Sequence, residues 1–255
     1  MAKTVPVLRS GVLAAALLVS FASNALADRI TLTGHPDYRN GPGGEFNITA
    51  ADAAGKALLA NLSTGYKIVN GTTVGTADGT LMNSGFDGVV GFQTFCIEMS
   101  ETISLNTTYN ATISTSAFNG GVGPAGDPVS IGTAYLYSLF ATRVLSGYDY
   151  TNGPGRAASA TLLQDAFWVL EEDKTPEQIG PNAFLNLAMA QFGGTLAGAR
   201  ANNNVSLYQV YALNLTDDQG ALKQSQLILV PDGGVTLMLL GFGLSGLALL
   251  RRKSN

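Results

Sequence analysis

The chain of 255 residues contains one cysteine, one histidine and one tryptophan: Cys96, His35 and Trp168. A single cysteine cannot close a disulfide within the chain, and one cysteine with one histidine forms no metal-ligand cluster. The Gly-x-Ser-x-Gly motif of serine hydrolases and the phosphate-binding loop are also missing. The sequence therefore predicts a fold without internal disulfides and a protein with no metal and no cofactor.

Basic residues are also scarce, with 14 Lys and Arg against 18 Asp and Glu. Five of the 14 cations lie in the two ends of the chain: Lys3, Arg9, Arg251, Arg252 and Lys253. The remaining nine, set against all 18 acidic residues, leave the region between the ends with a net charge of −9. Nucleic-acid binding needs a cationic face, so we expect no nucleic-acid partner.

The N-terminus has the three parts of a secretory signal peptide. Lys3 and Arg9 make it positive, residues 11–21 form a short apolar run, and Ala25-Leu26-Ala27 is a small-x-small cleavage site. The apolar run is too short to span a membrane. The pattern predicts that residues 1–27 are removed and that the exported chain begins at Asp28.

The C-terminus also has three parts, which read as a strand-breaking motif, an apolar span and a basic stop. Residues 235–250 carry no charge and are near the lower limit of about 17 residues for a transmembrane helix. Basic residues directly after a span stay in the cytoplasm, so residues 28–232 are expected outside it. The motif is Val230, Pro231, Asp232, Gly233 and Gly234, and the stop is Arg251, Arg252 and Lys253.

This tail resembles the PEP-CTERM class of sorting signals in its VPDSG-like variant, written here as VPDGG. The resemblance implies an exosortase-type sorting peptidase as a partner, transient anchoring in the inner membrane through the C-terminal helix, and release to the cell surface or beyond. Gly233 stands where the variant has Ser, which leaves the cleavage position open. The tail beyond the motif is expected to be lost after sorting.

Residues 28–229 are predicted to form one β-rich domain, either a sandwich or a barrel-like fold. Short runs of β-branched and aromatic residues end in Gly, Pro and Asn, and the 31 glycines suit tight turns. The last two runs are predicted to pair as a hairpin around the turn 216–221. The predicted strands are 30–34, 45–49, 88–99, 107–115, 205–215 and 222–230.

The middle of the chain follows a helical pattern instead. Apolar residues recur at helical spacing in 128–147, in 156–172 and in 181–192. Pro181 suits the first turn of the third segment. The sequence therefore predicts an inserted helical subdomain of about three helices over residues 128–192.

Two short motifs contain the only cysteine and the only tryptophan. The first is Phe95-Cys96-Ile97, within a predicted strand, and the second is Leu163-Gln164-x-Ala166-Phe167-Trp168, within the second predicted helix. Together they resemble the bacterial thioester domains of surface adhesins. That family has an aromatic-Cys-aliphatic motif on a strand and, further on, an apolar-Gln-x-Ala-apolar-Trp motif.

The resemblance implies an internal thioester between the sulfur of Cys96 and the side-chain carbonyl of Gln164, formed with loss of ammonia. A surface or matrix partner that bears amines would then be captured covalently. This is a single-turnover step, so the protein is not expected to be an enzyme. A thioester must be kept dry, and the two groups must be held in contact for it to form. The expected shell is Phe95, Ile97, Ala166, Phe167 and Trp168.

Two other hypotheses remain open on sequence alone. In the first, the protein is a passive matrix or biofilm component, Cys96 is a buried apolar thiol and Gln164 is a solvated helix residue. In the second, Cys96 and His35 form a cysteine hydrolase, which needs an imidazole beside the thiol. Glu98 and Asp165 are candidates for a proton relay because they are close to the two motifs in sequence.

Overall fold

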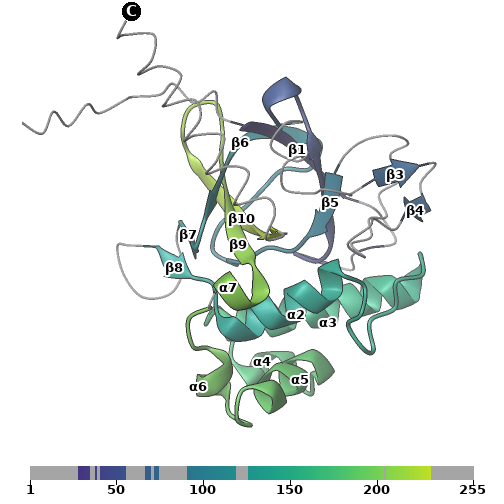
Figure 1. Ribbon diagram of the computed structural model, residues 1–255, viewed down its shortest axis with the longest axis vertical. Helices are drawn as coiled ribbons and strands as arrows, with labels where there is room; N and C mark the ends of the chain where they lie inside the picture. The colour runs from purple at the N-terminus through teal and green to yellow at the C-terminus, as the bar shows by residue number, and fades with distance from the viewer. Residues whose placement is uncertain are drawn as a thin grey trace, which may run out of the picture.

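The described part of the chain has a β-sheet on one side and helices on the other (Figure 1). The computed structural model describes residues 28–34, 38, 41–55, 67–69, 72–74, 91–118, 126–203 and 205–230. The predicted signal peptide, residues 1–27, and the predicted membrane-spanning helix, residues 235–250, lie outside these ranges. Among the described residues, no helix is long and apolar enough to cross a membrane.

Six antiparallel strands form the main sheet, in the order β10-β9-β6-β1-β2-β5. They are β1 (Asp28–Gly34), β2 (Phe46–Ala50), β5 (Gly91–Thr94), β6 (Thr107–Ser114), β9 (Val210–Thr216) and β10 (Leu222–Leu229). Two small hairpins lie beside it: β3 (Lys67–Val69) with β4 (Thr72–Val74), and β7 (Ser116–Ala117) with β8 (Asp127–Pro128).

The sheet curls into a half-barrel whose outer strands meet just after β5. Cys96 forms an isolated antiparallel bridge with Gln226 of β10. The N–H of Ile97 donates to Ser225 O at 2.9 Å, and the N–H of Leu227 donates to Phe95 O at 3.0 Å. Cys96 therefore lies where the two edges of the curved sheet join.

The sheet separates two apolar clusters, because successive side chains of a strand point to opposite faces. The inner cluster fills the curve of the sheet and includes Ile30, Leu32, Phe46, Ile48, Phe92, Cys96, Leu213 and Ile228. The outer cluster lies between the sheet and the helices, and includes Phe95, Ile97, Val210, Ala212, Leu227 and the buried faces of the helices.

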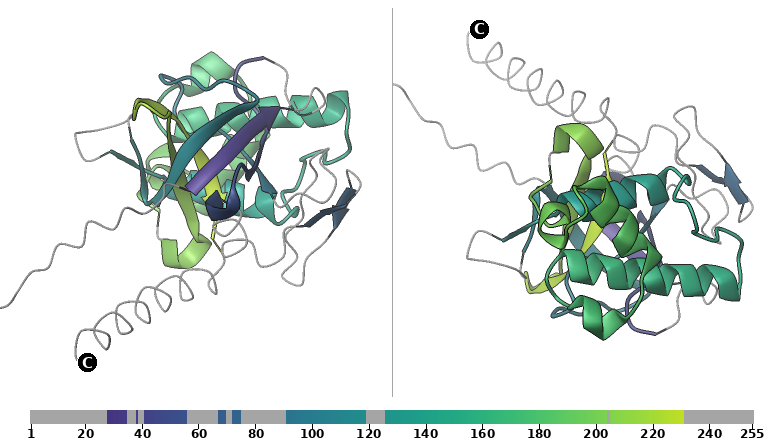
Figure 2. Two further views of the ribbon diagram at one scale, coloured as in Figure 1. Left: turned by 90° about the horizontal axis from the view of Figure 1, so that it is seen from above. Right: turned by 90° about the horizontal axis from the view of Figure 1, so that it is seen from below.

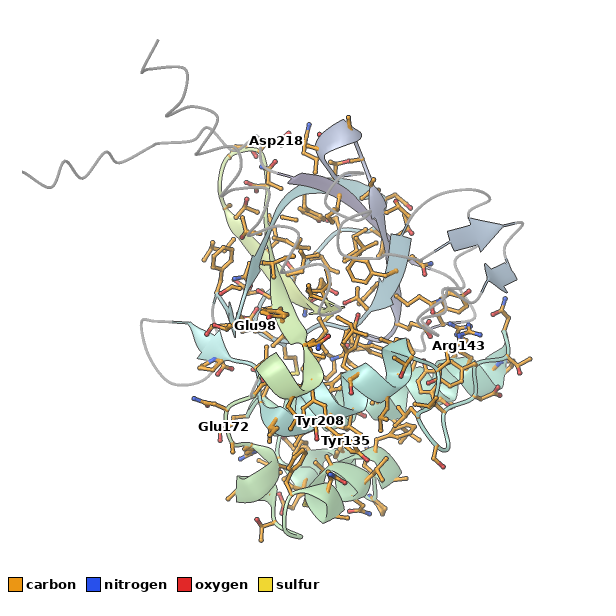
Figure 3. All side chains as sticks on the ribbon, in the orientation of Figure 1. Glu98, Tyr135, Arg143, Glu172, Tyr208 and Asp218 are labelled. Atoms are coloured by element: carbon orange, nitrogen blue, oxygen red, sulfur yellow. The ribbon has the colours of Figure 1, made fainter. Side chains whose placement is uncertain are left out.

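In the described part of the chain, six helices, α2 to α7, form the layer on the outer side of the sheet. Helices α2 and α3 lie against it, and α4, α5 and α6 lie beyond them (Figures 1 and 2). Aromatic side chains join this layer internally, as where the rings of Tyr135 and Tyr208 lie 5.7 Å apart (Figure 3). The helices are α2 (Ile131–Ala141), α3 (Pro154–Leu170), α4 (Pro176–Ile179), α5 (Ala183–Gln191), α6 (Leu196–Ala199) and α7 (Val205–Tyr208).

Local capping explains where the longer helices begin. The side chain of Ser130 accepts the N–H of Thr133 at the start of α2, and Pro154 occupies the first turn of α3, where its missing N–H costs nothing. In α5 the capping side chain is Asn182, which accepts the N–H groups of Phe184 and Leu185. The prediction of Pro181 in the first turn is therefore wrong, since the helix begins after the Asn182 cap.

The mainly β prediction is confirmed, and so is the final hairpin, formed by β9 and β10. The prediction of about three helices is wrong: α4, α6 and α7 have only four residues each, too short to produce a helical period in the sequence. The helices extend to Tyr208, beyond the predicted limit at residue 192. The predicted strand 205–215 thus begins with a helical turn, and β9 starts at Val210.

One buried carboxylate joins α2 to the end of α3. Glu171 accepts hydrogen bonds from the main-chain N–H of Ser130 at 3.2 Å and from its hydroxyl at 2.7 Å. Burial, reinforced by the negative charge of Asp127, raises the pKa of Glu171 from 4.5 to about 7. The charged form is therefore destabilised in the folded state relative to the unfolded state.

This shift predicts that the fold loses stability as the pH rises. The folded state holds the Glu171 proton more tightly, so its stabilising effect is complete below about pH 4.5 and is lost as the pH passes through 7. The loss is up to roughly 3 kcal/mol. Glu171→Gln should remove that part of the pH dependence and be more stable than the unchanged protein at pH 8, as measured by urea unfolding at pH 5 and pH 8.

Burial also raises the pKa of Asp127, to about 6, so Asp127 adds its own loss of stability as the pH rises. The variant must therefore be compared with the unchanged protein at each pH. Glu172→Gln is the matched control, because the Glu172 side chain is 50% exposed. Parallel curves for the unchanged protein and Glu171→Gln would contradict this account.

Candidate functional site

Gln164 is buried in the middle of α3, where it points at the sheet. It is 1% exposed, and the neighbouring Leu163, Phe167 and Trp168 are buried beside it. Gln164 is therefore not a solvated residue on the helix surface. A buried amide must find hydrogen-bond partners, and those of Gln164 lie in the sheet.

The amide of Gln164 is inserted between two main-chain segments that would otherwise pair. In the β2–β5 ladder Phe46 faces Thr94 and Asn47 faces Gln93, so the next antiparallel positions would place Gly44 opposite Cys96. Instead, Gln164 Oε1 accepts the N–H of Gly44 and the N–H of Cys96, each at 3.1 Å. Its Nε2 donates to Cys96 O at 2.9 Å. The amide of Gln164 thus replaces one rung of the ladder and lies directly against Cys96.

The thiol of Cys96 is fully buried and has a side-chain partner of its own. Its Sγ donates to Gln224 Oε1 at 2.9 Å, and Gln224 Nε2 donates to the main-chain oxygen of Glu98. The structure therefore brings Cys96 and Gln164 together through the main chain of Cys96, while the thiol itself is turned toward Gln224.

The expected apolar shell is buried throughout, and four of its five residues lie on the opposite side of the strand from the thiol. Phe95, Ile97, Ala166 and Phe167 belong to the outer cluster, and the Phe95 and Phe167 rings are 5.3 Å apart in an edge-on contact. Cys96 belongs to the inner cluster, because its side chain alternates with those of its neighbours. The two flanking residues therefore seal the helix-facing side, and the curve of the sheet encloses the thiol.

Trp168 lies over the loop that precedes β2. A Cβ built on Gly43 would lie 2.6 Å from Trp168 Cη2 and 2.8 Å from Gln164 Cγ. Gly43 also has a φ of +70°, which side chains other than glycine rarely adopt. Only glycine lets this loop approach α3 closely enough for Gly44 to reach Gln164.

A buried ion pair fixes the same loop to α3. The guanidinium of Arg156 donates through Nε to Glu45 Oε2 at 2.9 Å and through Nη2 to Glu45 Oε1, and neither side chain is exposed. The hydroxyl of Tyr148 donates to Glu45 Oε2 at 2.7 Å. The Arg156 guanidinium also lies over the Tyr38 ring, 3.9 Å from its centroid.

Glu45 sets the protonation of the Arg156 and Tyr148 side chains that contact it. Burial lowers the pKa of Arg156, but its hydrogen bond to Glu45 and the charge of Glu45 outweigh that effect, so its pKa is raised overall. Burial and the neighbouring Glu45 together hold the pKa of Tyr148 well above its usual value. Arg156 therefore stays charged and Tyr148 stays a hydrogen-bond donor throughout the ordinary pH range.

A pocket of about 250 Å³ opens beside Cys96 and Gln164. Gly43, Met99, Glu101, Trp168 and Gln224 all line it. Gly43 lies against Gln164, and Gln224 accepts the hydrogen bond of the thiol. The pocket is therefore lined by one neighbour of Gln164 and one neighbour of the Cys96 thiol.

The two candidates for a proton relay differ in environment. Glu98 is buried and lies with the strands (Figure 3), where its Oε2 accepts the N–H of Ser225 at 3.3 Å. Asp165 forms a partly exposed ion pair with Lys174 at 2.6 Å. His35 lies outside the described residues.

Sequence reasoning missed Gly44, Glu45, Arg156 and Gln224. The doublet Gly43-Gly44 before a strand is a signal for a close backbone approach, and Glu45 at the edge of an apolar strand is a signal for a buried charge. Arg156 gives no such signal, since an arginine in the first turn of a helix is usually solvated. Gln224 lies on a strand whose pairing with residues 95–97 the sequence does not reveal.

Residues 230–254 match the VPDSG-CTERM motif family. This match confirms the predicted sorting signal, and it indicates an exported, cell-surface protein that a sorting peptidase processes. Val230 is the only residue of the motif or the basic stop that lies within the described ranges. No curated protein and no solved structure matches the chain. The resemblance to thioester domains therefore rests on the two motifs alone.

Proposed function

We propose that this exported protein carries an internal thioester between Cys96 and Gln164 and uses it to capture amine-bearing partners at the cell surface. The observation that carries the proposal is the insertion of the Gln164 amide against Cys96, with hydrogen bonds to both its N–H and its carbonyl oxygen. The amide of Gln164 is thereby held in a dry interior against the main chain of Cys96, a residue 68 positions away in the sequence. Contact of this kind gives the high effective concentration that an unactivated amide needs.

The reaction exchanges the bond from Cδ to Nε2 for a bond from Cδ to Sγ and moves one proton from sulfur to nitrogen. The Cys96 sulfur attacks Cδ of Gln164, the bond from Cδ to Nε2 breaks, and the thiol proton leaves with the nitrogen as ammonia. Capture reverses the exchange: an amine attacks Cδ, a new amide forms and the Cys96 thiol is released. In this proposal the thiol first turns from Gln224 toward Gln164 by a rotation of its side chain.

The pocket beside Gly43 and Gln224 is the proposed entrance for the amine. Phe46, Met99 and Ile103 offer apolar contacts to the aliphatic stem of a lysine side chain, and Glu101 supplies a carboxylate that attracts a cation. The proposed order of events is export, transient anchoring by the C-terminal helix, removal of the tail by the sorting peptidase, and then capture.

Amine capture gives the direct test. The purified region 28–232 should weigh one ammonia less than its sequence requires, and incubation with methylamine should add the mass of methylamine to Gln164 in every molecule that carries the bond. The Cys96 thiol should resist alkylation before this treatment and react after it. Intact mass and peptide mapping measure each change.

Cys96→Ala and Gln164→Glu are the matched controls, since each keeps most of the side-chain volume and neither can form the bond by loss of ammonia. Both should have their full sequence mass and take up no methylamine. A native protein of full sequence mass that methylamine leaves unchanged would contradict the proposal.

In that case the better account is a passive component of the extracellular matrix, and one observation favours it. Every polar group of the pair already has a partner without a covalent bond: Gln164 completes the ladder and the thiol donates to Gln224. Gln164 would then serve only to close the gap between Gly44 and Cys96.

A further inference from the structure

Two main-chain N–H groups converge on one oxygen at this site. Gly44 N and Cys96 N each lie 3.1 Å from Gln164 Oε1, and they approach it from the ends of two different strands. Paired N–H groups aimed at a carbonyl oxygen in a water-free site stabilise the negative charge that this oxygen gains during acyl transfer. An amide needs such help, because its carbonyl is the least reactive of the common acyl groups.

We propose that the N–H groups of Gly44 and Cys96 form an oxyanion hole for the Gln164 acyl group, and that the buried Glu45–Arg156 ion pair positions it. This inference rests on the proposed thioester. When the Cys96 sulfur adds to Cδ, the electron pair of the carbonyl moves to Oε1, which both N–H groups then hold as an oxyanion. Collapse of the oxyanion expels Nε2, which leaves as ammonia with the thiol proton. The same hole acts again when an amine opens the thioester.

The ion pair is suited to this role by its place in the chain. Glu45 directly follows Gly44, and Arg156 lies two turns before Gln164 on the same helix, about 12 Å along its axis. The bidentate contact therefore ties the loop to α3 beside the acyl group and sets the distance from Gly44 N to Oε1. Arg156 is held in turn by Tyr150 O at 2.9 Å, so the anchor on the helix side is itself fixed.

The first test uses the unchanged protein and needs no variant. If two N–H groups hold the carbonyl oxygen, the infrared stretch of the thioester carbonyl should lie below that of a simple alkyl thioester in an apolar solvent. Labelling glutamine with carbon-13 at Cδ, with Cys96→Ala as the blank, identifies the band. An unshifted band in a protein that has lost ammonia would overturn the oxyanion hole.

The second test measures the rate of bond formation in positioning variants. Treatment with ammonia opens the thioester and restores Gln164 and the thiol; once ammonia is removed, intact mass follows its loss again. Arg156→Lys keeps the charge but not the two-pronged contact, and Glu45→Asp shortens the reach of the carboxylate. Each should slow bond formation about tenfold or more and move the carbonyl band upward, because a displaced N–H donor stabilises the oxyanion less.

Arg200→Lys is the matched control. It makes the same chemical change in a side chain that also donates to a main-chain carbonyl, Val169 O, which lies at the opposite end of α3 from Arg156. If all three variants re-form the bond at the rate of the unchanged protein, Glu45 and Arg156 do not position the Gly44 N–H group. That result would contradict the positioning role and leave the proposed thioester unaffected. If the unchanged protein never loses ammonia, the thioester itself is wrong and the oxyanion hole falls with it.

Discussion

Replacing Arg156 with methionine should destabilise the protein by about 3–5 kcal/mol, because it leaves the carboxylate of Glu45 charged, buried and without its guanidinium. Neither side chain of the pair is exposed, so water cannot substitute for the lost partner. The Tyr148 hydroxyl is one remaining donor, and a single neutral hydrogen bond does not compensate a buried charge. The free energy of unfolding in urea measures the loss.

The double variant Glu45→Met, Arg156→Met separates the ion pair from the packing of its side chains. Buried ion pairs replaced by apolar side chains of similar volume are often neutral in stability, so the double variant should recover most of the loss. Recovery would mean that the ion pair adds little to stability and serves to position the neighbouring Gly44 N–H group. A double variant less stable than Arg156→Met alone would contradict that interpretation.

Patterns of apolar residues predicted the sheet and the long helices because those elements bury one face over several turns or pleats. The run 107–115 became β6 (Thr107–Ser114), and the segment 156–172 became α3 (Pro154–Leu170). The four-residue helices α4, α6 and α7 were not predicted, because a single turn is too short for apolar residues to recur at helical spacing. Closure of the half-barrel at Cys96 also escaped it, because which strands pair at long range depends on the whole sheet.

The candidate site was predictable only as far as its motifs reach. The motifs identified Cys96 and Gln164, and alternation along a strand would have placed Phe95 and Ile97 on the opposite face from the thiol. The partners of the pair were not predictable, because the Gly44 N–H and the Cys96 N–H are main-chain groups that every sequence offers. What selects them is the close approach at Gly43 and the ion pair of Glu45, both of which depend on tertiary packing.

Gln164→Met should be less stable than the unchanged protein by about 3–5 kcal/mol, even when the thioester of the unchanged protein has first been opened with ammonia. Methionine keeps the volume of glutamine but forms none of its hydrogen bonds, so the N–H groups of Gly44 and Cys96 and the carbonyl of Cys96 lose their partner in a dry interior. Each buried polar group left without a partner costs roughly 1–3 kcal/mol. Gln219→Met, in the exposed turn between β9 and β10, should be nearly neutral.

Comparison with Cys96→Ala divides the effect of Gln164 into its two parts. Cys96→Ala keeps all three hydrogen bonds of the amide and loses the cross-link and the buried thiol, so its deficit measures these two together. The further loss in Gln164→Met measures the ladder rung that the amide replaces. If Gln164→Met unfolds at the same urea concentration as Cys96→Ala, the hydrogen bonds to Gly44 and Cys96 contribute nothing, and the insertion of Gln164 serves the covalent chemistry alone.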